Sequence, residues 1–357
     1  MSKTNFFLIT TLMIPLIISS GFVNPSQVEI QVPIDVNILS LIANGVGNTY
    51  FTVIDQFEKW GWNVTTAGLS DNHTGCPNKD PILVTSDILV SEINNVSHYD
   101  CIFIASGAQH KLLRIRQSVL DLIKTAYNEG LIISTLCAST VILADAGIIN
   151  DTKVTGHSIY KTEVEAAGGI FDLNVKVVSD KRVVTGAVGG GPYGGGDLTA
   201  PTFELCVAIA REILGISYIQ STSVTYSSEV FETKYVLKVE TTNLTNLPLD
   251  MSAPKISQIS AHIYQTNNNL TFVKVVQLTY NNNIYIGSFK GLEVGNYTVN
   301  IEIIDEEACI EVVRNATSFS IDSTTSSPVL IISLALISAF AIVISFLIFY
   351  LIRRRKS

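Results

Sequence analysis

The feature that most constrains the fold is the stretch 131–157, LIISTLCASTVILADAGIINDTKVTGH. It opens with an apolar run, passes through Cys137 and the residues Ala-Ser-Thr, and continues as an apolar segment of helical spacing that ends at Gly147. This order predicts a strand, a tight turn and a helix, with the cysteine at the turn. Such a nucleophile elbow pushes the side chain out of the sheet, and the start of the helix would favour a thiolate. The alternative is a small apolar residue buried at the end of a core strand.

Strands and helices alternate on both sides of this elbow. We predict strands at 35–43, 62–67, 101–105, 131–136, 153–155, 175–178 and 182–185, and helices at 50–60, 112–128, 141–146, 164–167 and 202–214. A glycine-rich loop runs from 186 to 196. This alternation favours an α/β domain at 35–215 with a parallel sheet that helices cover on both faces.

The stretch 35–215 resembles the ThiJ/PfpI superfamily, the group that includes the Parkinsonism-associated deglycase and the PfpI-type peptidases. The resemblance is strongest in CASTVILADAGIINDTKVTGH at 137–157, against the family pattern C-x-G-x-x-x-L-x-x-A-G-L-L-x-x-x-x-x-T-x-H. WNVTTAGL at 62–69, KDP at 79–81, YD at 99–100 and GAQ at 107–109 support it. It implies a flavodoxin-like three-layer sandwich, as in class I glutamine amidotransferase domains, and a homodimer.

The same resemblance assigns roles to individual residues. Cys137 matches the family nucleophile, and His157 matches the histidine that the deglycase branch keeps near its cysteine. Ala138 stands where the peptidase branch has a histidine, so that dyad is absent. The family's acidic residue falls near Thr49, and no Asp or Glu lies between 35 and 55, so the usual triad is incomplete.

The chemistry implied is attack by Cys137 on an electrophilic carbon. The N–H groups of Ala138 and of Gly107, which occupies the family's oxyanion turn, would hold the oxyanion, and His157 would move the proton. For His157 the alternative is a strand-end histidine that bonds backbone. His110 is a second candidate base, although a surface loop residue is the favoured interpretation of its position.

Beyond residue 215 the pattern changes. Residues 218–322 are rich in Thr, Asn and Val and lose helical periodicity, and GLEVGNYTVNI at 291–301 has a form frequent before a late strand of immunoglobulin-like and fibronectin-like modules. Short strands between polar turns predict an all-β sandwich of immunoglobulin type that folds separately from 35–215. Such a domain is more often a spacer or an adhesive platform than an enzyme.

The two ends of the chain predict membrane targeting. Residues 1–21 have the layout of a signal peptide, and 329–352 form an uncharged apolar run that is long enough to span a bilayer. Residues 323–328 would be a stalk, and the basic tail at 353–357 would stay inside. We therefore expect a single-pass type I protein of the cell membrane, in contact with membrane lipid through 329–352 and with both domains extracellular.

Sequons, cysteine spacing and net charge indicate whether glycans, metals, cofactors or nucleic acids are expected. Asn-x-Ser/Thr occurs at eight positions, which are candidate glycosylation sites: Asn63, Asn72, Asn95, Asn150, Asn243, Asn269, Asn296 and Asn315. The five cysteines show no CxxC spacing, so no metal site is expected, and no phosphate-loop motif or other cofactor signature appears. A net charge of −8 argues against nucleic acid as a partner.

Two functions remain open. The first is a Cys-dependent hydrolase or deglycase on small carbonyl adducts, which the retained Cys137 and His157 favour. The second is a non-catalytic module that senses a ligand or an oxidant or displays an adhesive surface, which the missing acid and the missing vicinal histidine favour. The substrate or ligand is not specified by the residues.

Overall fold

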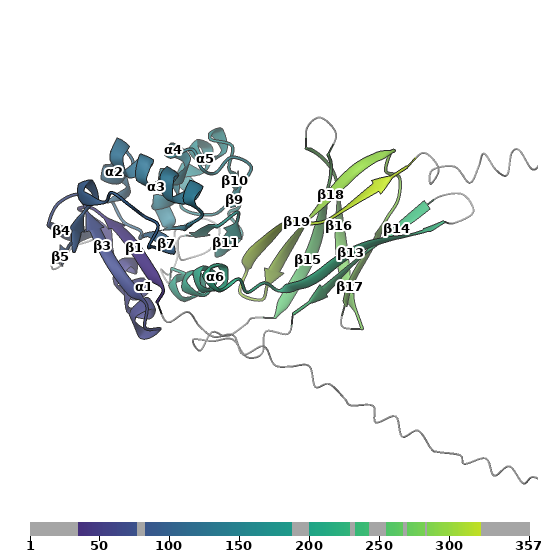
Figure 1. Cartoon of the computed structure of the whole chain (residues 1–357), viewed down its shortest axis with the longest axis horizontal. Coiled ribbons are helices and arrows are strands. Elements are labelled where there is room, and N and C mark those ends of the chain that lie inside the picture. Colours follow the sequence, from purple (N-terminus) through teal and green to yellow (C-terminus); the bar gives the residue numbers. More distant parts are fainter. Residues whose placement is uncertain are drawn as a thin grey trace, which may run out of the picture. The chain divides into compact units, whose positions relative to one another are not determined.

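The computed structural model describes residues 35–76, 83–187, 200–228, 233–242, 255–266, 270–282 and 284–322 (Figure 1). In the first half a seven-stranded array runs in the order β11-β12-β8-β7-β1-β3-β6. Its strands are β1 (Asn37–Ile42), β3 (Asn63–Gly68), β6 (Ile88–Leu89), β7 (Cys101–Ile104), β8 (Ile132–Leu136), β11 (Val177–Asp180) and β12 (Val183–Gly186). Every pairing is parallel except that of β11 with β12.

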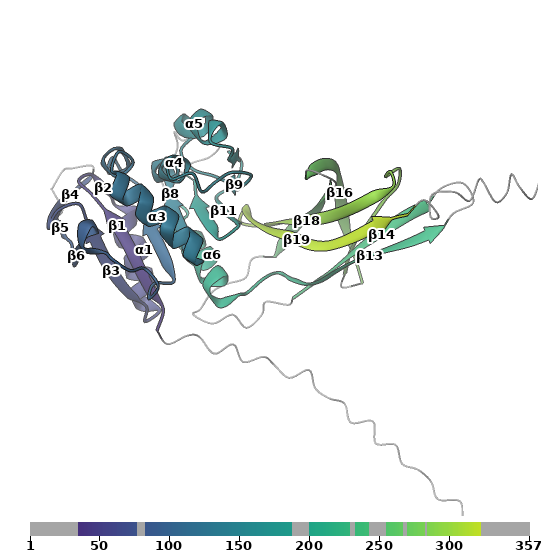
Figure 2. The same ribbon diagram turned by 45° about the horizontal axis from the view of Figure 1, so that its top comes forward.

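Helices cover both faces of this array, as the alternation predicted. They are α1 (Thr49–Lys59), α2 (His110–Leu113), α3 (Gln117–Glu129), α4 (Thr140–Asp145), α5 (Lys161–Ala166) and α6 (Thr202–Leu214). One core packs α3, α4 and α5 against alternate residues of the strands, such as Leu39 and Leu41 of β1. On the other face α1 packs against α6, and Phe57 of α1 meets Phe103 of β7 edge to face. Figure 2 shows α3 lying across the strands.

Small sheets and turns complete the first half. β2 (Val46–Gly47), β4 (Asn72–Cys76) and β5 (Leu83–Thr85) form a three-stranded sheet, and β9 (Lys153–Val154) pairs with β10 (Ile170–Phe171) outside the main sheet. The 3-10 turns are η1 (Val90–Glu92), η2 (Cys137–Ser139) and η3 (Ser158–Tyr160). Most of the predicted glycine-rich loop lies in 188–199, outside the described residues.

The second half contains β-strands only in its described part: β13 (Ile219–Ser228), β14 (Thr233–Thr241), β15 (Ile256–Gln265), β16 (Thr271–Asn281), β17 (Ile284–Phe289), β18 (Gly295–Asp305) and β19 (Cys309–Ile321). All the pairings among them are antiparallel. Alternate apolar residues of these strands, including Leu237, Ile263 and Ile301, form a second core. The all-β prediction is confirmed at this level, and the immunoglobulin-like type stays a prediction.

The prediction that the second half folds separately from 35–215 is wrong, because the two halves share a sheet. The beginning of β19 pairs in parallel with β11, from Val177 opposite Cys309 to Asp180 opposite Val312, and this joins the halves in one 14-stranded sheet. The physical reason is an open edge: β11 bonds β12 on one side only, and β19 supplies the hydrogen bonds for the other side. The predicted limits at 215 and 218 stay a prediction.

The prediction of a single-pass type I membrane protein is corrected. Within the described residues, no helix is both long and apolar enough to cross a membrane. The helices α3 and α6 each have 13 residues, whereas a spanning helix needs about 20. The predicted signal peptide, stalk, membrane segment and basic tail, at 1–21, 323–328, 329–352 and 353–357, lie outside the described residues.

Candidate functional site

The structure places Cys137 at the predicted elbow. The residue follows β8 directly and opens the turn η2, and only two residues separate it from α4. Its φ of 63° lies in the left-handed region, which costs a non-glycine residue about 1–2 kcal/mol. The turn is held in place because the Ser139 hydroxyl donates to the Ala105 carbonyl at 2.6 Å. Strain of this kind, retained at a partly exposed cysteine, is typical of a functional position.

The protonation of Cys137 differs from the prediction. Burial raises the pKa of the Cys137 thiol, and the N–H of Ala138, which donates to the sulfur, offsets this only in part. The helix that follows is short and begins three residues later, so it does not reverse the cost of burying a charge. The resting state is therefore a neutral thiol rather than the expected thiolate.

The two predicted oxyanion donors differ in their hydrogen-bond partners. The Ala138 N–H faces the sulfur, and the Gly107 N–H has no hydrogen-bond partner among the described residues. Gly107 has a φ of +114°, and a Cβ there would lie 2.3 Å from the Gly45 carbonyl oxygen and 2.4 Å from the Gly47 nitrogen. Only glycine fits this turn.

His157 lies beside the elbow through its backbone. Its N–H donates to the Cys137 carbonyl at 3.1 Å, and Gly156 permits this approach, because a Cβ at that position would lie 2.8 Å from the same oxygen. The ring Nδ1 accepts the Ile159 N–H at 3.3 Å. Since a backbone N–H can only donate, the neutral ring carries its proton on Nε2. Burial lowers the pKa of His157, so the ring is neutral near pH 7.

The side chains of Cys137 and His157 are not hydrogen-bonded to each other in the described part of the chain. The hydrogen bonds of His157 to backbone agree with the alternative interpretation, and its predicted part in proton transfer stays a prediction. At the position expected for the family's acid, the Thr49 hydroxyl contacts the Ser106 hydroxyl at 2.5 Å and accepts the Ser106 N–H at 3.2 Å. A neutral hydroxyl pair thus occupies that place.

The interpretation of His110 as a surface loop residue is wrong. His110 begins α2 and is only 5% exposed. Its Nδ1 bonds the Gly107 carbonyl at 2.7 Å, and its Nε2 contacts the Tyr160 hydroxyl at 2.5 Å. Burial lowers the pKa of His110. Sequence reasoning missed Tyr160 altogether, since no local pattern links residues 50 positions apart.

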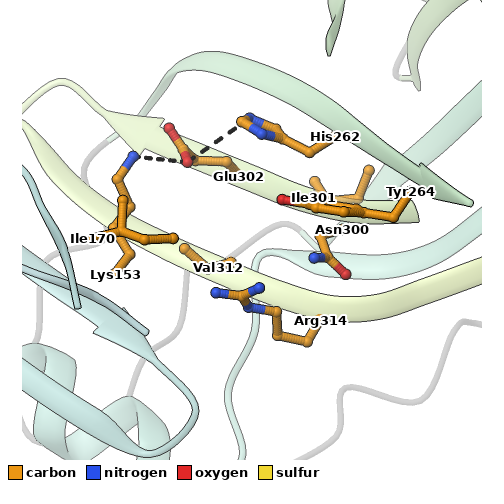
Figure 3. A pocket seen from close by; sticks show the side chains of 9 residues that line it. All are labelled: Lys153, Ile170, His262, Tyr264, Asn300, Ile301, Glu302, Val312 and Arg314. Atoms are coloured by element: carbon orange, nitrogen blue, oxygen red, sulfur yellow. Dashed lines mark hydrogen bonds and ion pairs between the residues drawn. The ribbon is translucent and has the colours of Figure 1, made fainter. Parts of the chain in front are cut away.

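A cavity of about 120 Å³ lies where the two halves meet (Figure 3). Lys153 enters it from β9, and His262, Glu302 and Arg314 enter from the second half. Lys153 bonds Glu302 at 2.8 Å, and Arg314 bonds the buried carboxylate of Asp180 at 2.6 Å. These cations are already paired, so the cluster ties the halves together rather than offering charges to a ligand.

The remaining predicted sites are placed as follows. Six of the candidate glycosylation residues have described side chains, and all six are exposed: Asn63, Asn72, Asn95, Asn150, Asn296 and Asn315. Asn243 and Asn269 lie outside the described residues. Exposure is necessary for a glycan but does not show one, so glycosylation stays a prediction.

Cys101 and Cys206 are buried free thiols in the sheet and in α6.

Comparison with known proteins gives a family match for the first half. Residues 36–193 match the DJ-1/PfpI family. The chain is 30% identical over 94 residues to protein DJ-1 homolog D of Arabidopsis thaliana, covering 26% of this chain and 24% of that protein. It is 23% identical over 180 residues to isonitrile hydratase of Pseudomonas putida, covering 49% and 74%. The matched part is thus about a quarter of the length of the plant homologue.

Two solved structures are similar to about half of the chain. A ThiJ/PfpI domain protein of Brachyspira murdochii is 19% identical with a TM-score of 0.44, covering 52% of this chain and all of that one. DJ-1beta of Drosophila melanogaster is 20% identical with a TM-score of 0.43, covering 51% and 91%. The match to the DJ-1/PfpI family thus spans residues 36–193, and beyond it this chain has a large β-rich C-terminal region.

Proposed function

We propose that the domain at 36–193 is a cysteine-dependent hydrolase or deglycase that acts on small carbonyl adducts, with Cys137 as the nucleophile. The observation that carries the proposal is the strained backbone of Cys137 at a turn where the Ala138 N–H donates to the sulfur, while the Gly107 N–H has no partner among the described residues. Members of the DJ-1/PfpI family are often enzymes of this kind or stress-response proteins.

The raised pKa decides how the reaction would start. Because the thiol is neutral near pH 7, its proton passes to hydroxide or water before the sulfur attacks. The sulfur–carbon bond forms as the carbonyl π electrons move to oxygen, and the two N–H groups hold that oxyanion. In an acyl substrate the carbon–leaving-group bond then breaks as the carbonyl re-forms, the leaving group takes a proton from water, and water hydrolyses the thioester to release the acid and regenerate the thiol. A hemithioacetal adduct first dissociates into its free thiol and an α-oxoaldehyde, and the sulfur adds to the aldehyde carbon. Loss of the proton from that carbon and reprotonation at the neighbouring carbon convert this enzyme hemithioacetal into a thioester, which water hydrolyses to a hydroxy acid and the free Cys137 thiol.

His157 has a specific part in this scheme. With Nδ1 accepting the Ile159 N–H, the ring offers an Nε2–H donor and no free lone pair. We assign it the role of a hydrogen-bond donor to developing negative charge, instead of the predicted proton carrier. Since the imidazole pKa is lowered by burial, the ring keeps this form at and above neutral pH.

A second function, a redox or ligand sensor without turnover, is supported by the Thr49–Ser106 pair that stands in place of a carboxylate. One experiment separates the two. Purified protein and its Cys137→Ser variant are incubated with methylglyoxal adducts of N-acetylcysteine and with an alkyl isonitrile, the compound class named for the Pseudomonas putida relative. Consumption by the wild type alone supports the enzyme. Equal rates for both proteins, at the level of buffer, contradict it.

A further inference from the structure

The pair His110 and Tyr160 connects the two loops that flank Cys137. His110 belongs to the loop after β7, which also carries Gly107, and Tyr160 belongs to the turn η3, which follows His157 directly. The imidazole contacts both loops at once, through the Gly107 carbonyl at 2.7 Å and the Tyr160 hydroxyl at 2.5 Å. No other part of the proposed chemistry uses these two side chains.

The hydrogen-bond partners fix the proton positions in this pair. A carbonyl can only accept, so Nδ1 of His110 carries the proton, and in the neutral ring Nε2 accepts the Tyr160 O–H. His157 is the opposite tautomer, because its Nδ1 accepts. Two histidines that are close to each other in the fold are thus held in opposite states by backbone groups.

The ring of Tyr160 is enclosed on several sides. It meets the His110 ring edge to face at a centroid distance of 5.2 Å and the His157 ring at 6.5 Å. The Arg114 guanidinium lies 5.7 Å from the Tyr160 ring centre. Arg114 is held in turn by Asp145, in the helix that follows the cysteine turn, with bonds of 2.7 and 3.1 Å.

We propose that His110 and Tyr160 are positioning residues, which fix the Gly107 turn and the His157 turn relative to each other on either side of Cys137. Neither side chain touches the sulfur in the contacts described. They act through Gly107 and His157, and Arg114 prevents the tyrosine ring from turning away. This inference rests on the proposed thiol chemistry, because it concerns the geometry around the same sulfur.

The first test measures the tautomers of His110 and His157 and does not depend on any reaction. Long-range ¹H–¹⁵N correlation spectra of the histidine rings at pH 7.5 should show His110 as the Nδ1–H tautomer and His157 as the Nε2–H tautomer. In Tyr160→Phe, which removes one hydroxyl and keeps the ring, the Nε2 resonance of His110 should shift because it loses its donor. An Nε2–H tautomer at His110, or unchanged resonances in the variant, would overturn the proposal.

The second test measures how the His110–Tyr160 contact affects the reactivity of the Cys137 sulfur. Iodoacetamide alkylation of Cys137 is followed by peptide mass spectrometry from pH 6 to 10 in the wild type, in Tyr160→Phe and in Tyr127→Phe. Tyr127, on α3, stacks with Arg182 and serves as the matched control. Loss of a positioning contact should change the rate or the midpoint of the profile by roughly threefold to tenfold in Tyr160→Phe only.

The outcomes separate the two proposals. Equal profiles for the two tyrosine variants, both with reactive cysteine, would refute the positioning role and leave the nucleophile intact. If wild-type Cys137 does not react at all, the proposed function fails, while the tautomer measurement still decides whether His110 joins the two loops.

Discussion

Gly107→Ala is the substitution whose cost the structure defines most closely. A Cβ at a φ of +114° would lie 2.3 Å from the Gly45 oxygen and 2.4 Å from the Gly47 nitrogen, and both are backbone atoms that cannot rotate away. Gly61→Ala is the matched control, since Gly61 also has a positive φ, +78°, but nothing lies within 4 Å of the added carbon.

Both substitutions carry the cost of a left-handed backbone, and only Gly107→Ala adds a steric clash. A left-handed backbone costs a non-glycine residue about 1–2 kcal/mol, which applies to both variants. Overpacking adds roughly 1–3 kcal/mol for Gly107→Ala alone. We therefore expect its free energy of unfolding to fall by about 2–5 kcal/mol, against about 1–2 kcal/mol for Gly61→Ala.

Urea denaturation followed by circular dichroism measures both values. A parallel alkylation assay on folded protein should show slower modification of Cys137 in Gly107→Ala and no change in Gly61→Ala, because only the first turn borders the proposed site. Equal destabilisation of the two variants would refute the close approach of the Gly107 turn to Gly45 and Gly47.

Three further predictions follow. Arg314→Ala removes the cation paired with the Asp180 carboxylate, whose side chain is 0% exposed, and leaves it the bond from the Lys153 N–H. The free energy of unfolding should therefore fall by about 3–5 kcal/mol. Lys59→Ala breaks an exposed pair and should cost less than about 1 kcal/mol in the same urea titration. Cys137→Ser should abolish turnover of any carbonyl adduct that the wild type consumes, as measured by substrate loss. His157→Ala should slow that turnover about 100-fold by removing a charge-stabilising donor, whereas His157→Gln, which keeps an N–H, should retain more; equal rates in these two variants would exclude the donor role.

Local patterns allowed much of the first half to be predicted. The helix predicted at 202–214 is α6 with the same limits, because apolar spacing and Gly215 as a left-handed cap determine it within one segment. The elbow was predicted for the same reason, since the strand, the cysteine and the helix are consecutive in the chain.

What could not be predicted depends on residues far apart in the sequence. The pairing of β19 with β11 joins positions more than 120 residues apart, and neither strand signals which edge it will meet. The contact of His110 with Tyr160 and the burial of His110 arise only when two loops come together. The predicted lowering of the Cys137 pKa was wrong for a related reason. Burial by residues that are distant in the sequence raises this pKa more than the local Ala138 N–H lowers it.

The pH dependence of Cys137 alkylation in the folded protein tests the central claim most directly. An accessible nucleophile with a raised pKa should react while the protein is folded, and its rate should keep rising above pH 8.5, the ordinary pKa of cysteine being about 8.5. Circular dichroism at each pH confirms that the fold persists. If Cys137 is unmodified in the folded protein at every pH and reacts only in urea, the sulfur is closed to substrates and the proposed nucleophile is contradicted.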